Sequence, residues 1–319
     1  MRSIRVAALL FALMPGLAIA QAWPSRPVHL IVPFPPGGST DVAARVIADK
    51  LAAAIGQPVV VENRAGAGGV LGTTQVSRAD PDGYTILLAA NQVSTMHLVI
   101  KDIKYDLLRD FAPITQVSTQ PNALAVNPSL GVTDVKGLVE RAKANPGKLF
   151  YAHPGPGSDQ QMTAELLWRA AGIHVTGVPY KGGGQAIIDL IAGHVPMALL
   201  GITPLIPSYK AGQIRIIAVT SKERFPILPD IPTLEESGYR GVESTQWLGL
   251  LAPRGTSPAI VERLQVETSK ILAQPDVRDR FAQAGLVPVG NTPAQFAEVI
   301  RSEDERWTKV AHDLGIAPQ

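Results

Sequence analysis

The chain has 319 residues, no cysteine and a formal net charge of +2 at pH 7. The lack of cysteine excludes disulfide bonds, thiolate metal sites and a cysteine nucleophile. Arg2 and Arg5 lie in a separate N-terminal segment, and without them the chain carries 27 basic and 27 acidic residues. Because no run of Lys and Arg remains, we expect no nucleic-acid partner.

The N-terminal segment has the pattern of a secretory signal peptide. Arginines precede an apolar run, Val6–Leu13, which is too short to span a membrane comfortably. Small residues follow it and suit cleavage near Ala20 or Ala22. An uncleaved anchor is the less favoured alternative. We therefore expect residues 1–22 to be removed and the protein to reach a bacterial periplasm, with a core large enough to fold without disulfides.

The first predicted unit is a strand, a turn and a helix. Val28–Phe34 is an apolar strand that ends in Pro-Pro-Gly-Gly, since proline lacks a ladder donor and glycine adopts positive φ readily. Ser39 or Thr40 is predicted to cap the helix that follows, whose apolar residues recur at helical spacing up to Ile55. A helix N-terminus reached through glycines has backbone N–H groups free to bind an anion.

Further strands and helices alternate along the chain. They are the strand Pro58–Glu62, a glycine-rich turn with a helix to Ala79, the strands Tyr84–Ala90, Phe111–Val117 and Ala123–Val126, and a helix Thr133–Ala144 capped by Thr133.

The order of the first unit then returns. Leu149–Ala152 is a predicted strand, a Pro/Gly turn follows it, and Asp159–Ala171 is a helix with Ser158 and Gln161 spaced as a capping box. The elements after it are the strand His174–Pro179, a glycine turn Lys181–Gly184 with a helix to Ile191, the strand Val195–Gly201, a short helix Pro204–Ala211 and the strand Ile214–Thr220. The repeated order indicates two similar α/β domains, each a mixed sheet flanked by helices.

The last third of the chain adds a strand, Gln246–Ala252, and helices from Ser257 onward, without another glycine-turn unit. We therefore predict that the chain returns to complete the first domain, crossing near Pro121–Ala125 and again near Trp247. The expected domain bounds are 23–122 plus 246–319 for domain 1 and 123–245 for domain 2, with a ligand cleft between them.

Two glycine turns at matched positions point to a ligand site. Ligands of open α/β sheets bind at the carboxyl ends of strands, where both turns lie. Opposed helix N-termini would hold a carboxylate by the backbone N–H groups of Gly37–Thr40 and Gly157–Asp159. Either turn alone is better explained as a tight strand-to-helix connection, and the pair leaves both interpretations open.

Other chemistries find little support. There is no phosphate-binding motif and no paired histidine motif, so we expect neither a metal nor a cofactor. A serine hydrolase fits poorly, because Asp159 follows Ser158 where its motif needs glycine. We expect Trp247 either to line the cleft or to pack in the core. For Phe34 and Tyr180, packing in the core is somewhat favoured over ligand contact. Asp41 is better explained by the helix dipole than by ligand contact.

The segments PFPPGGSTD, VVVENRAGAGG, PDGYT, NPGKLFYA, VPYKGGGQAIIDLIAGHV and WLGLLAPRGT resemble the Bug family. These proteins are extracytoplasmic solute receptors of tripartite tricarboxylate transporters. The resemblance spans essentially the whole mature chain. It implies a type II periplasmic binding protein, a Venus flytrap whose two domains close on a small carboxylated ligand, held by main-chain groups and ordered waters without catalysis.

The resemblance also implies ligand contacts from the segment Ala90–Ser94 and from Trp247. Together with the glycine turns and their neighbours, the candidate ligand-binding residues are Phe34, Gly37, Gly38, Ser39, Thr40, Asp41, Ala67, Gly68, Asn91, Gln92, Ser94, Gly155, Gly157, Ser158, Asp159, Tyr180, Thr203 and Trp247.

Two segments depart from the family pattern. The second loop commonly continues with serines and a histidine, and here it continues Asp159-Gln160-Gln161. Asp159 either caps the helix and points away from the ligand, or meets a hydroxyl or amine of the ligand. Asn91–Leu98 also differs from the usual small Ser/Thr pattern. Both departures lie where ligand choice should be made, so no particular substrate is implied.

The sequence therefore predicts a monomeric periplasmic receptor that captures a small organic acid for membrane transporter subunits. Three alternatives stay open. The chain could be a sensor that reports ligand state to a membrane signalling partner, an orphan receptor whose cleft no longer fits the usual acids, or, least favoured, an exported hydrolase.

Overall fold

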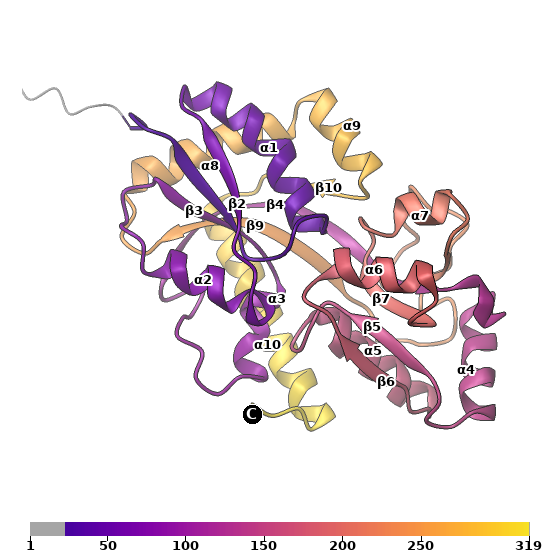
Figure 1. Ribbon diagram of the computed structural model, residues 1–319. Coiled ribbons are helices and arrows are strands. Elements are labelled where there is room, and N and C mark those ends of the chain that lie inside the picture. Colours follow the sequence, from indigo (N-terminus) through magenta and orange to yellow (C-terminus); the bar gives the residue numbers. More distant parts are fainter. Residues whose placement is uncertain (1–22, 319) are drawn as a thin grey trace, which may run out of the picture.

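The computed structural model describes residues 23–318, so the predicted signal peptide lies outside the described residues. The chain forms two lobes joined by two long strands, β4 (Phe111–Val126) and β9 (Thr245–Pro253) (Figure 1). The elements of the first lobe are β1 (Val28–Val32), α1 (Ser39–Ile55), β2 (Val59–Asn63), η1 (Ala67–Gly69), α2 (Val70–Ser77), β3 (Thr85–Ala90), α3 (Gln92–Thr95), η2 (Met96–Leu98), α8 (Pro258–Leu272), α9 (Pro275–Gln283), β10 (Val287–Pro288) and α10 (Pro293–Leu314). The elements of the second lobe are η3 (Pro128–Leu130), α4 (Val135–Ala144), β5 (Phe150–His153), α5 (Asp159–Ala171), β6 (Thr176–Pro179), α6 (Gly183–Ala192), β7 (Met197–Gly201), α7 (Ile206–Lys210) and β8 (Arg215–Val219).

The predicted repeat is present in both lobes. In the first lobe, β1 pairs in parallel with β2 and β3. In the second, β5 pairs in parallel with β6 and β7. Each set of three strands is linked by two helices, α1 and α2 or α5 and α6. Parallel strands need such crossover helices, which explains why strands and helices alternate in the sequence.

The long strands β4 (Phe111–Val126) and β9 (Thr245–Pro253) connect the lobes. They run antiparallel from Phe111 opposite Pro253 to Pro121 opposite Thr245. Beyond that point β4 pairs with β7 instead, starting with Asn122 opposite Gly201. The two strands predicted for this region are thus one continuous strand, which changes partner at Pro121.

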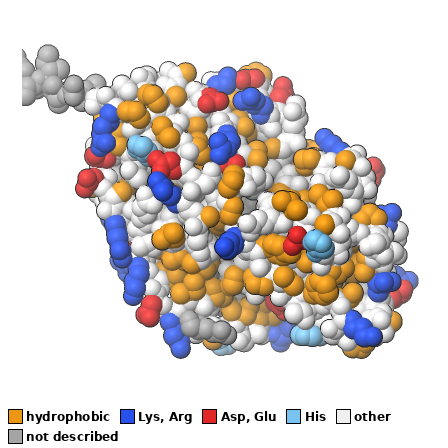
Figure 2. Space-filling model, in the orientation of Figure 1, with side chains coloured by type: hydrophobic (Ala, Val, Ile, Leu, Met, Phe, Trp, Pro, Cys, Tyr) orange, Lys and Arg blue, Asp and Glu red, His pale blue; other side chains and the backbone are white. Residues whose placement is uncertain are grey.

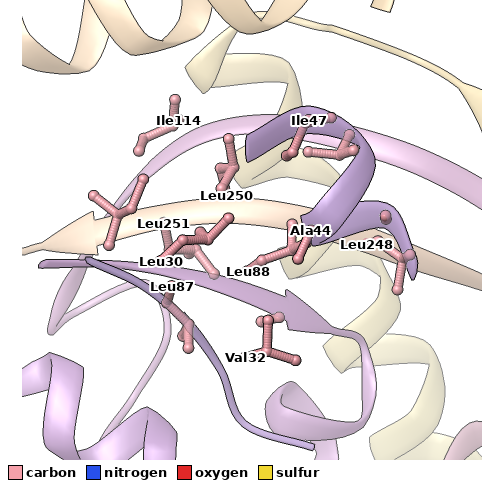
Figure 3. Close-up of a cluster of buried hydrophobic side chains, with 14 of the residues drawn as sticks. Leu30, Val32, Ala44, Ile47, Leu87, Leu88, Ile114, Leu248, Leu250 and Leu251 are labelled. Carbon is pink, nitrogen blue, oxygen red and sulfur yellow. The ribbon is translucent and has the colours of Figure 1, made fainter. Parts of the chain in front are cut away.

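Buried aliphatic side chains hold each lobe together. In the first lobe, Leu30 of β1, Ile47 of α1 and Leu88 of β3 are fully buried in one cluster, which Figure 3 shows together with the leucines of β9. The second lobe has two clusters of its own, on the two faces of its sheet. Removing this apolar surface from water stabilises the fold by roughly 25 cal/mol per Å².

Helix α10 (Pro293–Leu314) also touches the second lobe. Its side chains Phe296, Ile300 and Trp307 are buried, while Val310 is only partly buried. Trp307 packs in a small cluster with Met162 of α5, so α10 bridges the lobes, as its course toward α5 in Figure 1 shows. A capping box formed by Thr292 and Gln295 begins this helix.

Two predicted caps are wrong. The N-cap of α1 is Gly38, and Ser39 and Thr40 are already inside the helix. Asp134 rather than Thr133 caps α4, because its side chain accepts the Gly137 N–H at 2.7 Å. Neighbouring hydroxyl and carboxylate residues are all competent caps, so only backbone geometry decides among them.

On the face drawn in Figure 2, Lys and Arg side chains are scattered among Asp and Glu. Across residues 23–318, no helix combines the length and the apolar character needed to cross a membrane.

Candidate functional site

A small cavity of about 40 Å³ lies between the two lobes. None of its lining residues is charged. They are Phe34, Pro35, Gly38, Ser39, Thr40, Ala90, Gln92, Pro154, Gln160, Gly182, Gly183, Gly201, Pro204 and Gln246. A cavity of this size has room for a few water molecules. Any charge placed here would be met by backbone groups and amide side chains.

Two helix N-termini reach this cavity, one from each lobe. Helix α1 begins after Gly38 and helix α6 after Gly182, and neither has a side-chain cap. The first N–H groups of a helix have no intrahelical partner, and the helix dipole makes that end positive. The cavity therefore offers an anion donors from both lobes.

Glycine is required where these helix starts meet. Gly182 has φ +148°, which side chains rarely tolerate, and a Cβ on it would lie 3.3 Å from Cδ of Pro35. A Cβ on Gly184 would lie 2.9 Å from the carbonyl oxygen of Pro36. The lobes are thus in backbone contact, and the structure describes a closed state.

Helix α5 has a different N-terminus. Ser158 Oγ accepts the Gln161 N–H at 3.2 Å, while Gln161 Oε1 accepts the N–H of Gly157 at 2.9 Å. Only half of the predicted capping box therefore forms, because the glutamine reaches one residue beyond the cap. Side chains of the helix already use these N–H groups, and neither Gly157 nor Ser158 lines the cavity.

The Gly155–Gly157 turn makes contacts with the other lobe instead. Thr95 Oγ1 donates to the Gly157 carbonyl at 2.6 Å, and Gln92 Nε2 donates to the Pro156 carbonyl at 3.4 Å. A Cβ on Gly155 would lie 3.2 Å from Gln92 Nε2. This turn holds the closed lobes together at the edge of the cavity.

The candidate residues from the sequence divide into several groups. Those that line the cavity are Phe34, Gly38, Ser39, Thr40 and Gln92. Asn91, Ser158, Asp159 and Trp247 are buried without lining it. Five further candidates line other pockets. Gly37 and Thr203 line a pocket beside α9, and Ala67 and Gly68 line a pocket beside Gly315–Ala317. Ser94 lines a cavity of about 170 Å³ next to α10. Tyr180 donates to Asp189 Oδ2 at 2.6 Å.

The structure adds residues that sequence reasoning missed. Gln246 lines the cavity, whereas its neighbour Trp247 packs edge-on against Phe296 with ring centroids 5.2 Å apart. Successive residues of a strand face opposite sides, so a tryptophan in the core turns the preceding residue toward the cavity. Gln160 lies one residue past the Asp159 departure, and Gly182 begins the second glycine turn of its lobe. The departure at Asp159-Gln160 and the second glycine turn were both visible in the sequence and could have pointed to these residues.

Asp41 is occupied within its own lobe. Its carboxylate accepts Arg45 Nη2 at 2.9 Å, the Gly37 N–H at 3.0 Å and Asn63 Nδ2 at 3.0 Å. Burial raises the pKa of Asp41, but these hydrogen bonds and the arginine charge outweigh it and hold the pKa below its usual value. The side chain fixes the loop before α1.

Asp159 is buried in a polar network at the point where β4 changes partner. Its Oδ2 accepts Asn122 Nδ2 at 2.6 Å. Burial raises the pKa of Asp159 to about 7, against the opposing effect of the Asn122 hydrogen bond. Asp159 does not line the cavity in this closed state, and the N-cap of α5 is Ser158.

Residues 43–316 match a family model described as tripartite tricarboxylate transporter family receptor. The chain belongs to this receptor family. The receptor is 37% identical to protein BugT of Bordetella pertussis (strain Tohama I), over 93% of this chain and 91% of BugT.

Solved structures agree with this assignment. A Rhodopseudomonas palustris protein, Rpa4515, determined with adipate, superposes with a TM-score of 0.91 at 36% identity and covers 93% of the receptor and 100% of its own chain. MatC (Rpa3494) from the same organism, with bound malate, has a TM-score of 0.86 at 33% identity, covering 91% and 100%. The receptor thus has the two-domain periplasmic binding-protein fold that its sequence predicted.

Proposed function

We propose that the receptor captures a small organic acid between its lobes in the periplasm and presents it to a tripartite tricarboxylate-type transporter. One observation carries this proposal. The uncapped N-termini of α1 and α6 meet at a cavity without charged side chains. Backbone N–H groups at helix N-termini bind carboxylates without a basic residue. The adipate and malate bound to the two relatives support an acid as the ligand.

Binding would require the lobes to move. A cavity of about 40 Å³ is smaller than the roughly 150 Å³ that holds benzene in other proteins, so an organic acid needs the lobes to separate and the glutamines to shift. A ligand that contacts both lobes then favours the closed state by its differential contacts. The domains that move would be 23–122 with 246–319 against 123–245, with the strands near Pro121 as the hinge.

The remaining parts of the proposal follow from the family and the sequence. The receptor binds without turnover, is exported after cleavage near Ala20 or Ala22, acts as a monomer and engages membrane transporter subunits when closed. Backbone groups supply most of the affinity, and Gln92, Gln160 and Gln246 supply selectivity.

A thermal-shift screen tests this function. The protein, exported with its own leader and purified from the periplasm, is screened against di- and tricarboxylates, amino acids and aromatic carboxylates, each beside its amide. At one hundred times Kd an acid should add about 2.7 kcal/mol of stability. We expect a saturable rise with one class of acid and none with the matched amide. Equal shifts with acids and amides, or none at all, would contradict the proposal.

A further inference from the structure

Three buried side chains form a hydrogen-bonded chain that ends at the cavity. Asp159 Oδ2 accepts Asn122 Nδ2 at 2.6 Å, and Gln160 Nε2 donates to Asn122 Oδ1 at 2.7 Å. Asp159 and Gln160 are each 1% exposed, and Asn122 is fully buried. Gln160 is a lining residue of the cavity between the lobes.

The carboxylate fixes the orientation of both amides. An ionised carboxylate only accepts hydrogen bonds, so Asn122 must turn its nitrogen toward Asp159. The Asn122 oxygen then faces Gln160, which must donate a hydrogen bond from its own amide nitrogen. These hydrogen-bond partners determine which amide atom of Asn122 and of Gln160 is the nitrogen and which is the oxygen. Oε1 of Gln160 is consequently the polar atom of that side chain left over, and it is buried without a partner.

Two other acceptors beside this chain are also unpaired within the described residues. They are Oδ1 of Asp159 and Oδ1 of Asn91, whose Nδ2 donates to the Thr245 carbonyl at 3.4 Å. Neither Asp159 nor Asn91 lines the cavity, so Gln160 Oε1 is the one of these three acceptors that a ligand in the cavity can reach. A buried acceptor left unpaired costs about 1–3 kcal/mol, and a ligand that supplies a donor removes that cost.

We propose that Gln160 Oε1 accepts a hydrogen bond from the ligand and selects an organic acid that carries a hydroxyl or amino group over the same acid without one. This inference rests on the proposed function and specifies its substrate class. Asp159 acts as a positioning residue, because it holds Asn122 and through it the glutamine amide. Asp159 and Gln160, which both depart from the family loop, thus act together, because Asp159 orients the amide of Gln160 through Asn122.

Calorimetric titration of the periplasmically purified protein tests this inference at pH 8. The probes are matched sets: succinate, malate and aspartate in one, and glutarate, 2-hydroxyglutarate and glutamate in the other. We expect a donor-bearing member of at least one set to bind about tenfold or more tightly than the plain diacid. Plain diacids that bind as tightly as their hydroxy and amino counterparts would overturn the inference and leave the proposed function standing.

Variants separate hydrogen bonding from shape. Gln160→Met keeps the length of the side chain and removes the acceptor, so the preference within a set should disappear while the plain diacid still binds. Gln265→Met, at a part-buried glutamine on α8, is the matched control and should keep the preference. If Gln160→Met weakens all members of a set equally, the residue has only a packing role and the inference is wrong.

Asp159→Asn provides the second variant, in case Gln160→Met unfolds. An asparagine can donate as well as accept, so Asn122 is no longer held in one orientation. We expect the preference for donor-bearing acids to fall with little change in affinity for the plain diacid. An unchanged preference would contradict the positioning role. If no acid of either set binds the wild-type protein, this inference is overturned, while the proposed function is decided by the broader thermal-shift screen.

Discussion

Gly184 of α6 packs directly on the carbonyl oxygen of Pro36, which belongs to the other lobe. A Cβ at Gly184 would lie 2.9 Å from that oxygen, closer than real Cβ contacts allow. Gly184 has an ordinary helical position, so glycine is needed here for the approach of the two lobes and not for backbone conformation. The closed state depends on this contact beside the cavity.

Gly184→Ala should therefore weaken ligand binding without weakening the fold. Alanine favours a helix over glycine by about 1 kcal/mol, so α6 itself should not be destabilised. Closure must then shift the lobes apart, which we expect to raise Kd at least fivefold, on the scale of the cost of overpacking. Calorimetry measures the change. Ile188→Ala, at a residue 64% exposed on the same helix, is the control. An unchanged Kd for Gly184→Ala would show that closure does not need the contact.

Asp159→Asn should stabilise the protein increasingly as the pH rises. The folded pKa of Asp159 is about 7 against an ordinary value of 3.8, so the folded state holds the proton more tightly than the unfolded state. Its contribution to stability is complete below pH 3.8 and is lost as the pH rises through about 7. Relative to wild type, the melting temperature of the variant should rise by a few degrees between pH 4 and pH 8. A constant difference would contradict the raised pKa.

His153 lowers the stability of the protein in acid, the opposite of the pH dependence of Asp159. The side chain is 2% exposed, and burial lowers its pKa to about 4, although the Gly155 carbonyl acts against the shift. The unfolded state therefore binds the proton first, and stability is lost as the pH falls from 6.5 toward 4. We expect His153→Gln to remove a loss of roughly 2 kcal/mol over that range. Urea unfolding at pH 7 and pH 4.5 measures it, and an equal acid loss in both proteins would disprove the assignment.

Asp41→Ala should loosen the loop before α1. The carboxylate is nearly buried and accepts from Gly37, Arg45 and Asn63, so its removal leaves the Gly37 N–H without its partner and takes one hydrogen bond from each of the two side chains. We expect a loss of about 1–3 kcal/mol in unfolding free energy and faster amide hydrogen exchange at Gly37. Because the pKa of Asp41 is lowered, its contribution is also lost as the pH falls through its folded value, below 3.8.

Asp49→Ala is the control for that experiment, since Asp49 is an exposed aspartate on the same helix. It should leave the exchange at Gly37 unchanged. If both variants accelerate exchange equally, the effect comes from the helix and not from the hydrogen bonds of Asp41.

The alternating elements could be predicted from sequence because their signals are local. Buried strands such as β1 and β3 read as apolar runs, and the helical spacing that extends to Ile55 gives the end of α1. The strand β4 was predicted as two strands, Phe111–Val117 and Ala123–Val126, and the gap between them contains Pro121. Proline lacks a ladder donor and is rare inside a strand. It is tolerated here at the point where β4 leaves β9 for β7.

The site could be predicted only in part, because two of its features are long-range. The glycine turn at Gly182 and the one before α5 look alike in the sequence, and only the packing of the lobes decides which helix start reaches the cavity. Trp247 was weighed as a cleft wall, yet Phe296 from the far end of the chain draws it into the core. Gln160 acquires its role through Asn122, which lies on another strand.

Backbone amide chemical shifts measured by nuclear magnetic resonance test whether the acid is bound between the N-termini of α1 and α6. The 15N-labelled protein is titrated with the acid that gives the largest thermal shift. We predict that the amides of Ser39 and Thr40, at the start of α1, and of Gly183, at the start of α6, all shift and saturate with a single Kd. Shifts confined to one lobe, or to neither helix start, would contradict capture of the acid between two helix N-termini.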